Sequence, residues 1–316
     1  AWLLAEHRRG GPDNATALFR HLREHRPEIP AYYVADGRAE ADELRDLGNV
    51  VLRGSRRHRW LMLHAAALVS AHDADDCLLP AQWPKAQYLH HLAWRVGSRR
   101  VFLQHGLGYD PADPAWHRGT AGVELFLTSS PGEARAVRAD LGYTDGQVAV
   151  TGLPRFDALD RGPAGRRVLV VPGTGAGELP AAAGRFWRAV LDDGGLRPAL
   201  ERAGAELEVL TLDSPGTGTH PAREAVLDCS VLVTDRSALA LDAARAGRAV
   251  VLAAPDAVPA HLAPLQDDGA CVVRTPAELA DAVARRLDDG SPSAVTPGDR
   301  CAAARAVEAI EAVLRR

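Results

Sequence analysis

The sequence lacks the long hydrophobic runs that a membrane-spanning protein needs. None of its segments approaches the ~20 consecutive apolar residues that cross a bilayer. A hydrophobic fraction of 47% and a charged fraction of 25% are ordinary for a soluble globular protein. We therefore do not expect an integral membrane protein.

The sequence is also poor in cysteine and carries no excess of basic charge. Its four cysteines are widely separated, with no CxxC pair and no metal-ligand spacing: Cys77, Cys229, Cys271 and Cys301. We expect reduced, mostly buried thiols in a cytoplasmic protein, and no metal site. The net charge of −4 argues against general nucleic-acid binding. There is no initiator methionine and no signal peptide, so we expect a piece of a longer chain.

Short apolar runs alternate with helical patterns along the first half of the chain. An amphipathic helix is expected over 15–25, with Asp13 or Asn14 as N-cap, and another over 41–48. Strands are expected at 1–5, 29–36, 49–54, 61–72, 99–106, 123–130 and 146–154. This repeating β-α-β order predicts a mainly parallel sheet with helices on both faces.

After the Gly/Pro/Arg stretch DRGPAGRR (160–167), the same alternation begins again. A strand and glycine-rich turn are expected over 167–178, and amphipathic helices over 276–287 and 301–316. Further strands are expected at 207–215, 229–237, 248–256 and 270–275. We predict an α/β protein of two Rossmann-like lobes, an N-terminal domain at 1–160 and a C-terminal domain at 161–316. Ligands should bind in the cleft between the C-terminal edges of the two sheets.

One strand of the first lobe ends on polar residues. VFLQHG (101–106) delivers Gln104 and His105 and then the backbone-permissive Gly106 at the C-terminal end of a buried strand. Open α/β sheets place catalytic groups in this way, although a strand can also simply end at such a turn.

Two segments of the second lobe are candidates for binding phosphate. In TDRSALALDAARAG (234–247), the hydroxyls of Thr234 and Ser237 would lie beside the start of a helix, where phosphate is favoured; alternatively, Thr234 or Asp235 only caps that helix. PGTGAGE (172–178) is a turn whose glycines allow an anion to approach the backbone, but it is not a P-loop.

Three further segments leave alternatives open. In GLPRFDAL (152–159), Arg155 either clamps a phosphate or pairs with Asp157 to brace the hinge. SAHDADD (70–76) favours a solvated acidic turn over a metal site. The basic stretch 53–59 is either a solvated helix start or a contact with phosphate or a lipid head group.

Taken together, several segments resemble the CDP-glycerol glycerophosphotransferase family, which includes wall teichoic acid primases and polymerases. In order, they are WLLAEHRRGGPDNATALFRHLREHRPEIPAYYV, GS at 54–55, VSAH, VFLQHG, LTSS, GY at 142–143, TGLPRFDAL and VLVTDRS. The resemblance covers essentially the whole chain and is densest in the first 160 residues. It implies a GT-B-like fold and work at the cytoplasmic face of the membrane. It also implies transfer of glycerol phosphate from CDP-glycerol to a hydroxyl of a lipid-linked acceptor, with release of CMP and without a cofactor.

The resemblance also implies roles for particular residues. His105 matches the family's QHG histidine, the expected general base toward the acceptor hydroxyl. The residues expected on the acceptor side with it are Glu6, Asp13, Asn14 and Gln104. The residues expected to bind the donor and its phosphates are Arg155, Gly173, Thr174, Gly175, Thr234, Asp235, Arg236 and Ser237.

The second lobe departs from the family's pattern. Residues 172–175 read P-G-T-G where the family has P-T-W-R, and Asp213-Ser214 stand where it has His-Pro, while His220-Pro221 come later. Arg236 replaces the tyrosine of T-D-Y-S and could supply part of the missing positive charge. Three hypotheses follow: a transferase that uses CDP-glycerol or another CDP-polyol, a donor-binding or regulatory module of a larger bifunctional protein, and a GT-B sugar transferase. The QHG and GLPRFD pair argues against the last.

Overall fold

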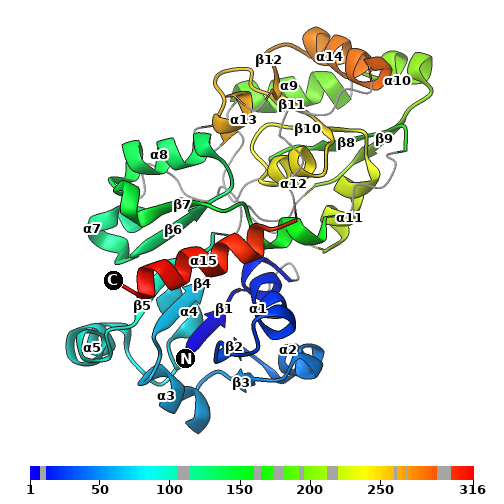
Figure 1. Cartoon of the computed structure of the whole chain (residues 1–316). Coiled ribbons are helices and arrows are strands. Elements are labelled where there is room, and N and C mark those ends of the chain that lie inside the picture. The colour runs from blue at the N-terminus through cyan, green and yellow to red at the C-terminus, as the bar shows by residue number, and fades with distance from the viewer. Residues whose placement is uncertain are drawn as a thin grey trace.

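The computed structural model contains two parallel β-sheets, each covered by helices, one above the other in Figure 1. It describes residues 1–7, 12–104, 114–159, 165–173, 181–191, 196–211, 220–259, 262–267, 269–289 and 300–316. The predicted α/β fold with two Rossmann-like lobes is confirmed.

The first sheet has seven parallel strands in the order β3-β2-β1-β4-β5-β6-β7. They are β1 (Trp2–Ala5), β2 (Ala31–Ala35), β3 (Val50–Leu52), β4 (Ala67–Ser70), β5 (Arg99–Phe102), β6 (Leu125–Thr128) and β7 (Val148–Val150). The strand order reverses between β1 and β4. Open α/β sheets bind ligands beyond the carboxyl ends of the strands at such a point.

The second sheet has five parallel strands in the order β12-β11-β10-β8-β9. They are β8 (Arg167–Val171), β9 (Glu206–Val209), β10 (Val231–Thr234), β11 (Ala249–Ala253) and β12 (Cys271–Val273). Here the order reverses between β8 and β10, as in flavodoxin-like sheets.

Helices cover both faces of each sheet, because parallel strands are apolar on both sides. Those of the first lobe are α1 (Asn14–His25), α2 (Arg38–Glu43), α3 (Arg56–Met62), α4 (Ala74–Leu78), α5 (Lys85–Tyr88), α6 (Trp94–Val96), α7 (Arg118–Ala121), α8 (Pro131–Leu141) and α15 (Ala302–Leu314). Those of the second lobe are α9 (Ala181–Leu191), α10 (Arg197–Ala203), α11 (His220–Asp228), α12 (Leu239–Arg245), α13 (Pro264–Asp267) and α14 (Pro276–Asp289). A π-helical turn, Leu89–Ala93, joins α5 to α6, and 3₁₀ turns span Arg45–Leu47, Pro114–Trp116, Asp145–Gln147 and Pro154–Ala158.

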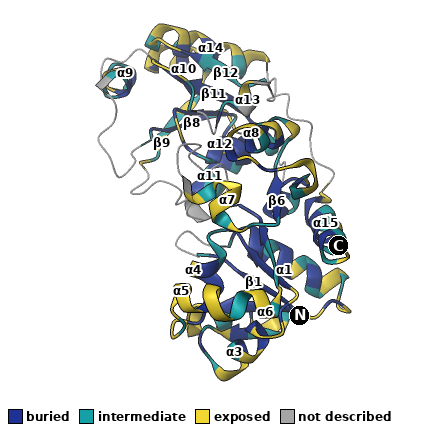
Figure 2. Cartoon of the chain, turned by 90° about the vertical axis from the view of Figure 1, so that its left-hand side faces the viewer, coloured by how far each residue is buried: buried dark blue, intermediate teal, exposed yellow. Residues whose placement is uncertain are grey.

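Each sheet is packed between two hydrophobic layers, and the buried residues follow the strands in Figure 2. In the first lobe, α1 and α15 pack on one face, α3 and α4 on the other, and α8 beside β5 and β6. In the second lobe, α11 and α12 cover one face, and α9, α10 and α14 the other.

The last helix returns to the first lobe. Ala306, Val307 and Ile310 of α15 lie in the core of the first sheet. The Asp157 carboxylate holds the start of α15 by accepting the backbone N–H of Ala302 at 2.9 Å and of Ala303 at 2.8 Å. Although α15 lies within the predicted C-terminal domain, 161–316, it packs on the N-terminal lobe. The boundary at residue 160 stays a prediction.

Two local expectations differ from the structure. The predicted strand 61–72 is shorter, because Leu61 and Met62 end helix α3 and the strand spans only Ala67–Ser70. The thiols of Cys77 and Cys229 are buried, but Cys271 is half-buried and Cys301 exposed, so the expected burial holds for two of four.

Candidate functional site

Polar residues follow the strands at both points of reversal. Glu6 and His7 come after β1, and His72 comes shortly after β4. In the second lobe, Gly173 follows β8 and Asp235 follows β10. The predicted site residues Glu6, Gly173 and Asp235 thus lie at these sheet edges, whereas His105, Thr174 and Gly175 lie outside the described residues.

Glu6 is buried and caps helix α1. Its carboxylate accepts the backbone N–H groups of Asp13 and Ala15 at 2.8 Å and of Thr16 at 3.3 Å, and the Thr16 hydroxyl at 2.5 Å. Burial, together with the charge of Asp13, raises the pKa of Glu6 to about 7. Asp13 is the N-cap residue, as predicted, but Glu6 satisfies the free N–H groups and leaves the Asp13 carboxylate for another partner.

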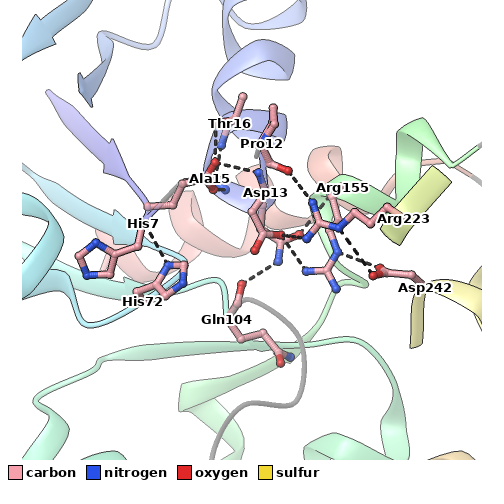
Figure 3. A network of polar contacts seen from close by, with 12 residues as sticks. His7, Pro12, Asp13, Ala15, Thr16, His72, Gln104, Arg155, Arg223 and Asp242 are labelled. Atoms are coloured by element: carbon pink, nitrogen blue, oxygen red, sulfur yellow. Dashed lines mark hydrogen bonds and ion pairs between the residues drawn. The ribbon is translucent and has the colours of Figure 1, made fainter. Parts of the chain in front are cut away.

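That partner is Arg155, which links the two lobes (Figure 3). Its guanidinium is 6% exposed and contacts Asp13 at 2.8 Å and Asp242 of α12 at 2.9 Å. Burial by itself would lower the pKa of Arg155, but the two carboxylates outweigh it and raise the pKa. Arg223 of α11 contacts Asp13 at 3.3 Å and Asp242 at 3.8 Å, and donates to the Pro12 carbonyl at 2.6 Å.

The structure therefore assigns Arg155 a bracing role with different partners from those expected. Asp157, the predicted partner, caps α15 instead. Two nitrogens of Arg155, Nε and Nη1, are engaged by buried carboxylates, and the phosphate-clamp alternative stays a prediction.

Asn14 joins the same region to the end of β5. Its Nδ2 donates to the Gln104 carbonyl at 2.6 Å, and its Oδ1 accepts the Arg155 backbone N–H at 3.2 Å. The Gln104 side chain donates to Glu133 at 2.7 Å. The four residues expected on the acceptor side, Glu6, Asp13, Asn14 and Gln104, thus lie together at one edge of the first sheet.

The expected phosphate site at the start of α12 is not built as predicted. The helix begins at Leu239, five residues after Thr234. The Thr234 hydroxyl donates to the Val171 carbonyl at 2.7 Å and accepts the Ser237 N–H at 3.1 Å, and the Ser237 hydroxyl accepts the Leu239 N–H at 3.3 Å. Both hydroxyls therefore hold the turn before α12, and neither Thr234 nor Asp235 is the N-cap residue, which is Ala238.

Asp235 connects the two strands at the reversal of the second sheet. Its Oδ1 accepts the Gly173 N–H at 2.6 Å, and its Oδ2 lies 3.8 Å from Nε of Arg236. A Cβ added to Gly173 would lie 1.9 Å from Cγ of Arg236, so the arginine side chain occupies the space that a side chain at residue 173 would need. The Arg236 side chain is 39% exposed at this edge.

The acidic turn at 70–76 is paired with basic residues and is not simply solvated. Asp75 contacts Arg100 at 2.7 Å and Lys85 at 3.4 Å, and Asp73 contacts Lys85 at 3.1 Å. His72 accepts the His7 N–H through Nδ1 at 3.2 Å. Among the described residues, no group of three or more His, Cys, Asp or Glu side chains could hold a metal ion.

The basic stretch 53–59 divides into buried and exposed residues. Arg53 contacts Asp36 at 3.0 Å, and His58 is fully buried, accepting the Gly54 N–H at 2.9 Å. Arg56 and Arg57 are exposed. Only part of this stretch can therefore reach an external partner.

His58 makes folding depend on pH. Burial lowers its pKa from 6.5 to about 4, so folding disfavours the protonated form. We expect the contribution of His58 to the free energy of unfolding to be fully present above pH 6.5. It should decline as the pH falls toward 4, by at most about 1.4 kcal/mol per pH unit. Urea unfolding at pH 7 and pH 4.5 should show a smaller decline in His58→Asn than in wild type. The exposed His64→Asn is the control, and an equal decline in all three proteins would contradict the assignment.

A groove of about 520 Å³ lies between the lobes. It is lined by α1, the Pro154–Leu159 segment and α11. The residues that directly follow the strands at the two points of reversal, such as Glu6 and Asp235, do not line this groove, so a ligand cleft between the two sheet edges stays a prediction.

Sequence reasoning missed Glu133, Asp242 and Arg223. Glu133 follows the pattern Ser-x-x-Glu, and the Ser130 hydroxyl accepts its N–H at 3.2 Å, so a capping box could have indicated it. Asp242 and Arg223 are ordinary helix charges with no such local signal.

The model of one protein family matches the first lobe. The family is described as CDP-glycerol:poly(glycerophosphate) glycerophosphotransferase, and the match covers residues 1–166. The chain belongs to this family. The match ends at residue 166, directly before β8.

Proteins similar to this glycerophosphotransferase-family chain are found both by sequence and by structure. The minor teichoic acid biosynthesis protein GgaB of Bacillus subtilis (strain 168) is 24% identical over 173 residues, 54% of this chain but only 19% of its own length. A solved variant of the wall teichoic acid polymerase TagF superposes with a TM-score of 0.62 at 13% identity, covering 99% of this chain and 89% of its own. The S. aureus MnaA–UDP complex gives a TM-score of 0.54 at 13% identity, covering 96% and 93%. The fold is GT-B-like.

Proposed function

We propose that this protein transfers glycerol phosphate, or a related polyol phosphate, from a CDP-activated donor to a hydroxyl acceptor in teichoic-acid-like polymer synthesis. The observation that carries the proposal is the family match over the first lobe. In that lobe Glu6, Asp13, Asn14 and Gln104 lie at one sheet edge, and Gln104 directly precedes His105 in the sequence. The acceptor is a lipid-linked molecule or the growing polymer, and the reaction takes place in the cytoplasm.

His105 is the proposed base. It accepts the proton of the acceptor hydroxyl while that oxygen attacks the β-phosphorus of the donor. The bond between this phosphorus and the bridging oxygen breaks, and CMP leaves with that oxygen and its electron pair. Cationic and N–H groups at the second-lobe edge stabilise the charge on the phosphoryl oxygens.

The direct test is release of CMP. The purified chain is incubated with an acceptor analogue and, in separate reactions, CDP-glycerol, CDP-ribitol or a UDP-sugar. We expect CMP from at least one CDP-polyol and no UDP from the sugar donor. Binding of CDP-glycerol without turnover would favour the donor-binding module, and UDP release would favour the sugar transferase. Neither binding nor release with any CDP donor would refute both CDP-based functions.

Arg236 is proposed to bind the donor diphosphate, with Gly173 making room for it. The arginine stem lies over Gly173 at the edge where β8 and β10 end, and this chain has no arginine in residues 172–175. We expect Arg236→Gln to raise the KM for CDP-glycerol about tenfold, the scale of one charge-assisted phosphate contact.

The matched variant is Gly173→Ala, whose Cβ must push the Arg236 side chain away. We expect it to raise the same KM, and the double variant to be no worse than Arg236→Gln alone, because both remove one interaction. Additive effects, or an unchanged KM in Arg236→Gln, would contradict this assignment.

We also propose peripheral contact with the inner face of the membrane through one surface of the first lobe. Within the described residues no helix is apolar and long enough to span a bilayer. Trp60 of α3 and Trp94 of α6 are 59% and 68% exposed. Leu63, directly after α3, and Leu89, between α5 and α6, are exposed as well. Helix α3 and the α5–α6 segment pack on the same core layer and lie near each other in Figures 1 and 2.

Charge supports a lipid partner for this surface. Residues 53–100 contain eight Arg and Lys against three Asp, a net +5 in a chain whose net charge is −4. Exposed tryptophans among arginines suit the boundary of an anionic bilayer.

Vesicle binding tests this surface. We expect the double variant Trp60→Ala/Trp94→Ala to bind phosphatidylglycerol vesicles at least tenfold more weakly than wild type. The double variant Arg56→Glu/Arg57→Glu should also bind more weakly in low salt, by about fivefold per charge. Val209→Ala, at an exposed apolar residue of the second lobe, should bind like wild type. Equal binding by all variants would contradict the proposed surface.

A further inference from the structure

The residue before His105 has a strained backbone. Gln104 has φ +52°, in the left-handed region that non-glycine residues rarely adopt. Such strain persists only where the surroundings impose it, and it concentrates at functional positions. Gln104 is also almost completely buried, at 1% exposure.

Hydrogen bonds to three other residues help hold Gln104 in this conformation. Its carbonyl accepts Nδ2 of Asn14 at 2.6 Å, and its Nε2 donates to Glu133 Oε1 at 2.7 Å and to the Leu127 carbonyl at 3.2 Å. Asn14 and Glu133 are fully buried. Glu133 is itself fixed, since its other oxygen accepts the N–H and hydroxyl of Ser129 at 2.6 and 2.7 Å.

The amide of Asn14 is matched to its two partners. Its Oδ1 accepts the Arg155 N–H at 3.2 Å while Nδ2 donates to Gln104. An aspartate could not make the second bond, because its oxygen would face a carbonyl oxygen. Arg155 in turn contacts Asp242 of the second lobe at 2.9 Å, so the end of β5 is tied to the hinge and through it to the opposite lobe (Figure 3).

From this geometry we infer that Asn14 is a positioning residue for His105, acting through the Gln104 backbone together with Glu133. The inference rests on the proposed role of His105 as base. Gln104 directly precedes His105 in the sequence, so a fixed Gln104 backbone restricts the positions that the proposed base can take. A base displaced by about 1 Å from its working position can lose about 10²-fold in rate.

The test compares Asn14→Ala with a matched control, Asn49→Ala. Asn49 also has a left-handed backbone (φ +54°), and its Nδ2 donates to the Ala31 carbonyl at 3.1 Å, but it lies beside β2 and β3. We expect Asn14→Ala to lower kcat for CMP release 10- to 100-fold, with the KM for CDP-glycerol within twofold. Asn49→Ala should leave kcat unchanged at a similar loss of melting temperature.

A second measurement does not need turnover. The ring resonances of His105, assigned by their absence in His105→Asn, are followed by NMR against pH. They should move in Asn14→Ala and not in Asn49→Ala. If Asn14→Ala does not fold, Asn14→Ser takes its place in both measurements.

The outcomes separate the positioning role from the proposed function. A folded Asn14 variant with kcat within twofold of wild type and unmoved His105 resonances overturns the positioning role. If wild type releases no CMP, the proposed function fails and the resonances alone decide: movement supports positioning, and no movement overturns it.

Discussion

Replacing Arg155 with alanine is expected to lower the free energy of unfolding by about 3–5 kcal/mol, because it leaves two buried carboxylates without their main partner. Asp13 is 7% exposed and Asp242 3%, and they come from different lobes. The loss should appear as a lower urea midpoint.

The control is Arg45→Ala, which removes an exposed ion pair with Asp42 and should cost less than about 1 kcal/mol. Adding Asp13→Asn and Asp242→Asn to Arg155→Ala should recover part of the loss, since the uncompensated charges are then gone. A loss below 1 kcal/mol for Arg155→Ala would mean that the network does not brace the lobes.

Replacing His105 with alanine is expected to lower kcat for CMP release by about 10²–10⁴-fold, the usual contribution of a general base. The KM for CDP-glycerol should change little, since the proposed donor residues lie on the other lobe. In wild type, kcat/KM should rise with increasing pH, because only the neutral ring accepts a proton. That rise should be absent from any residual activity of the variant.

His64→Ala is the matched control, because His64 is an exposed histidine of the same lobe. CMP release that survives His105→Ala within tenfold would remove His105 as the base and leave the reaction class standing.

Local patterns predicted much of the framework. The alternation of apolar runs and helical segments indicated parallel sheets, and parallel strands bring their carboxyl ends to one edge. The family resemblance grouped Glu6, Asp13, Asn14 and Gln104 on the acceptor side, and the structure joins them at one sheet edge, where the hydrogen bond from Asn14 to Gln104 spans 90 residues.

Partners chosen by packing could not be predicted. Arg155 was expected to meet a phosphate or its neighbour Asp157, and it contacts Asp242, 87 residues away. Thr234 and Ser237 were expected to offer hydroxyls to a ligand, and both close a turn before α12. Side-chain hydroxyls and charges of these types fit several roles, and only their distance to a partner decides among them.

The sequence by itself determined the two Rossmann-like lobes, the family of the first, and the polar residues at its sheet edge, because periodicity and motifs are properties of neighbouring residues. The tertiary structure decided which lobe holds α15, that Arg155 braces the lobes, and that Gln104 is held by Asn14 and Glu133. These depend on burial and on contacts between distant segments, where a charge or amide takes the one partner within reach in the folded chain.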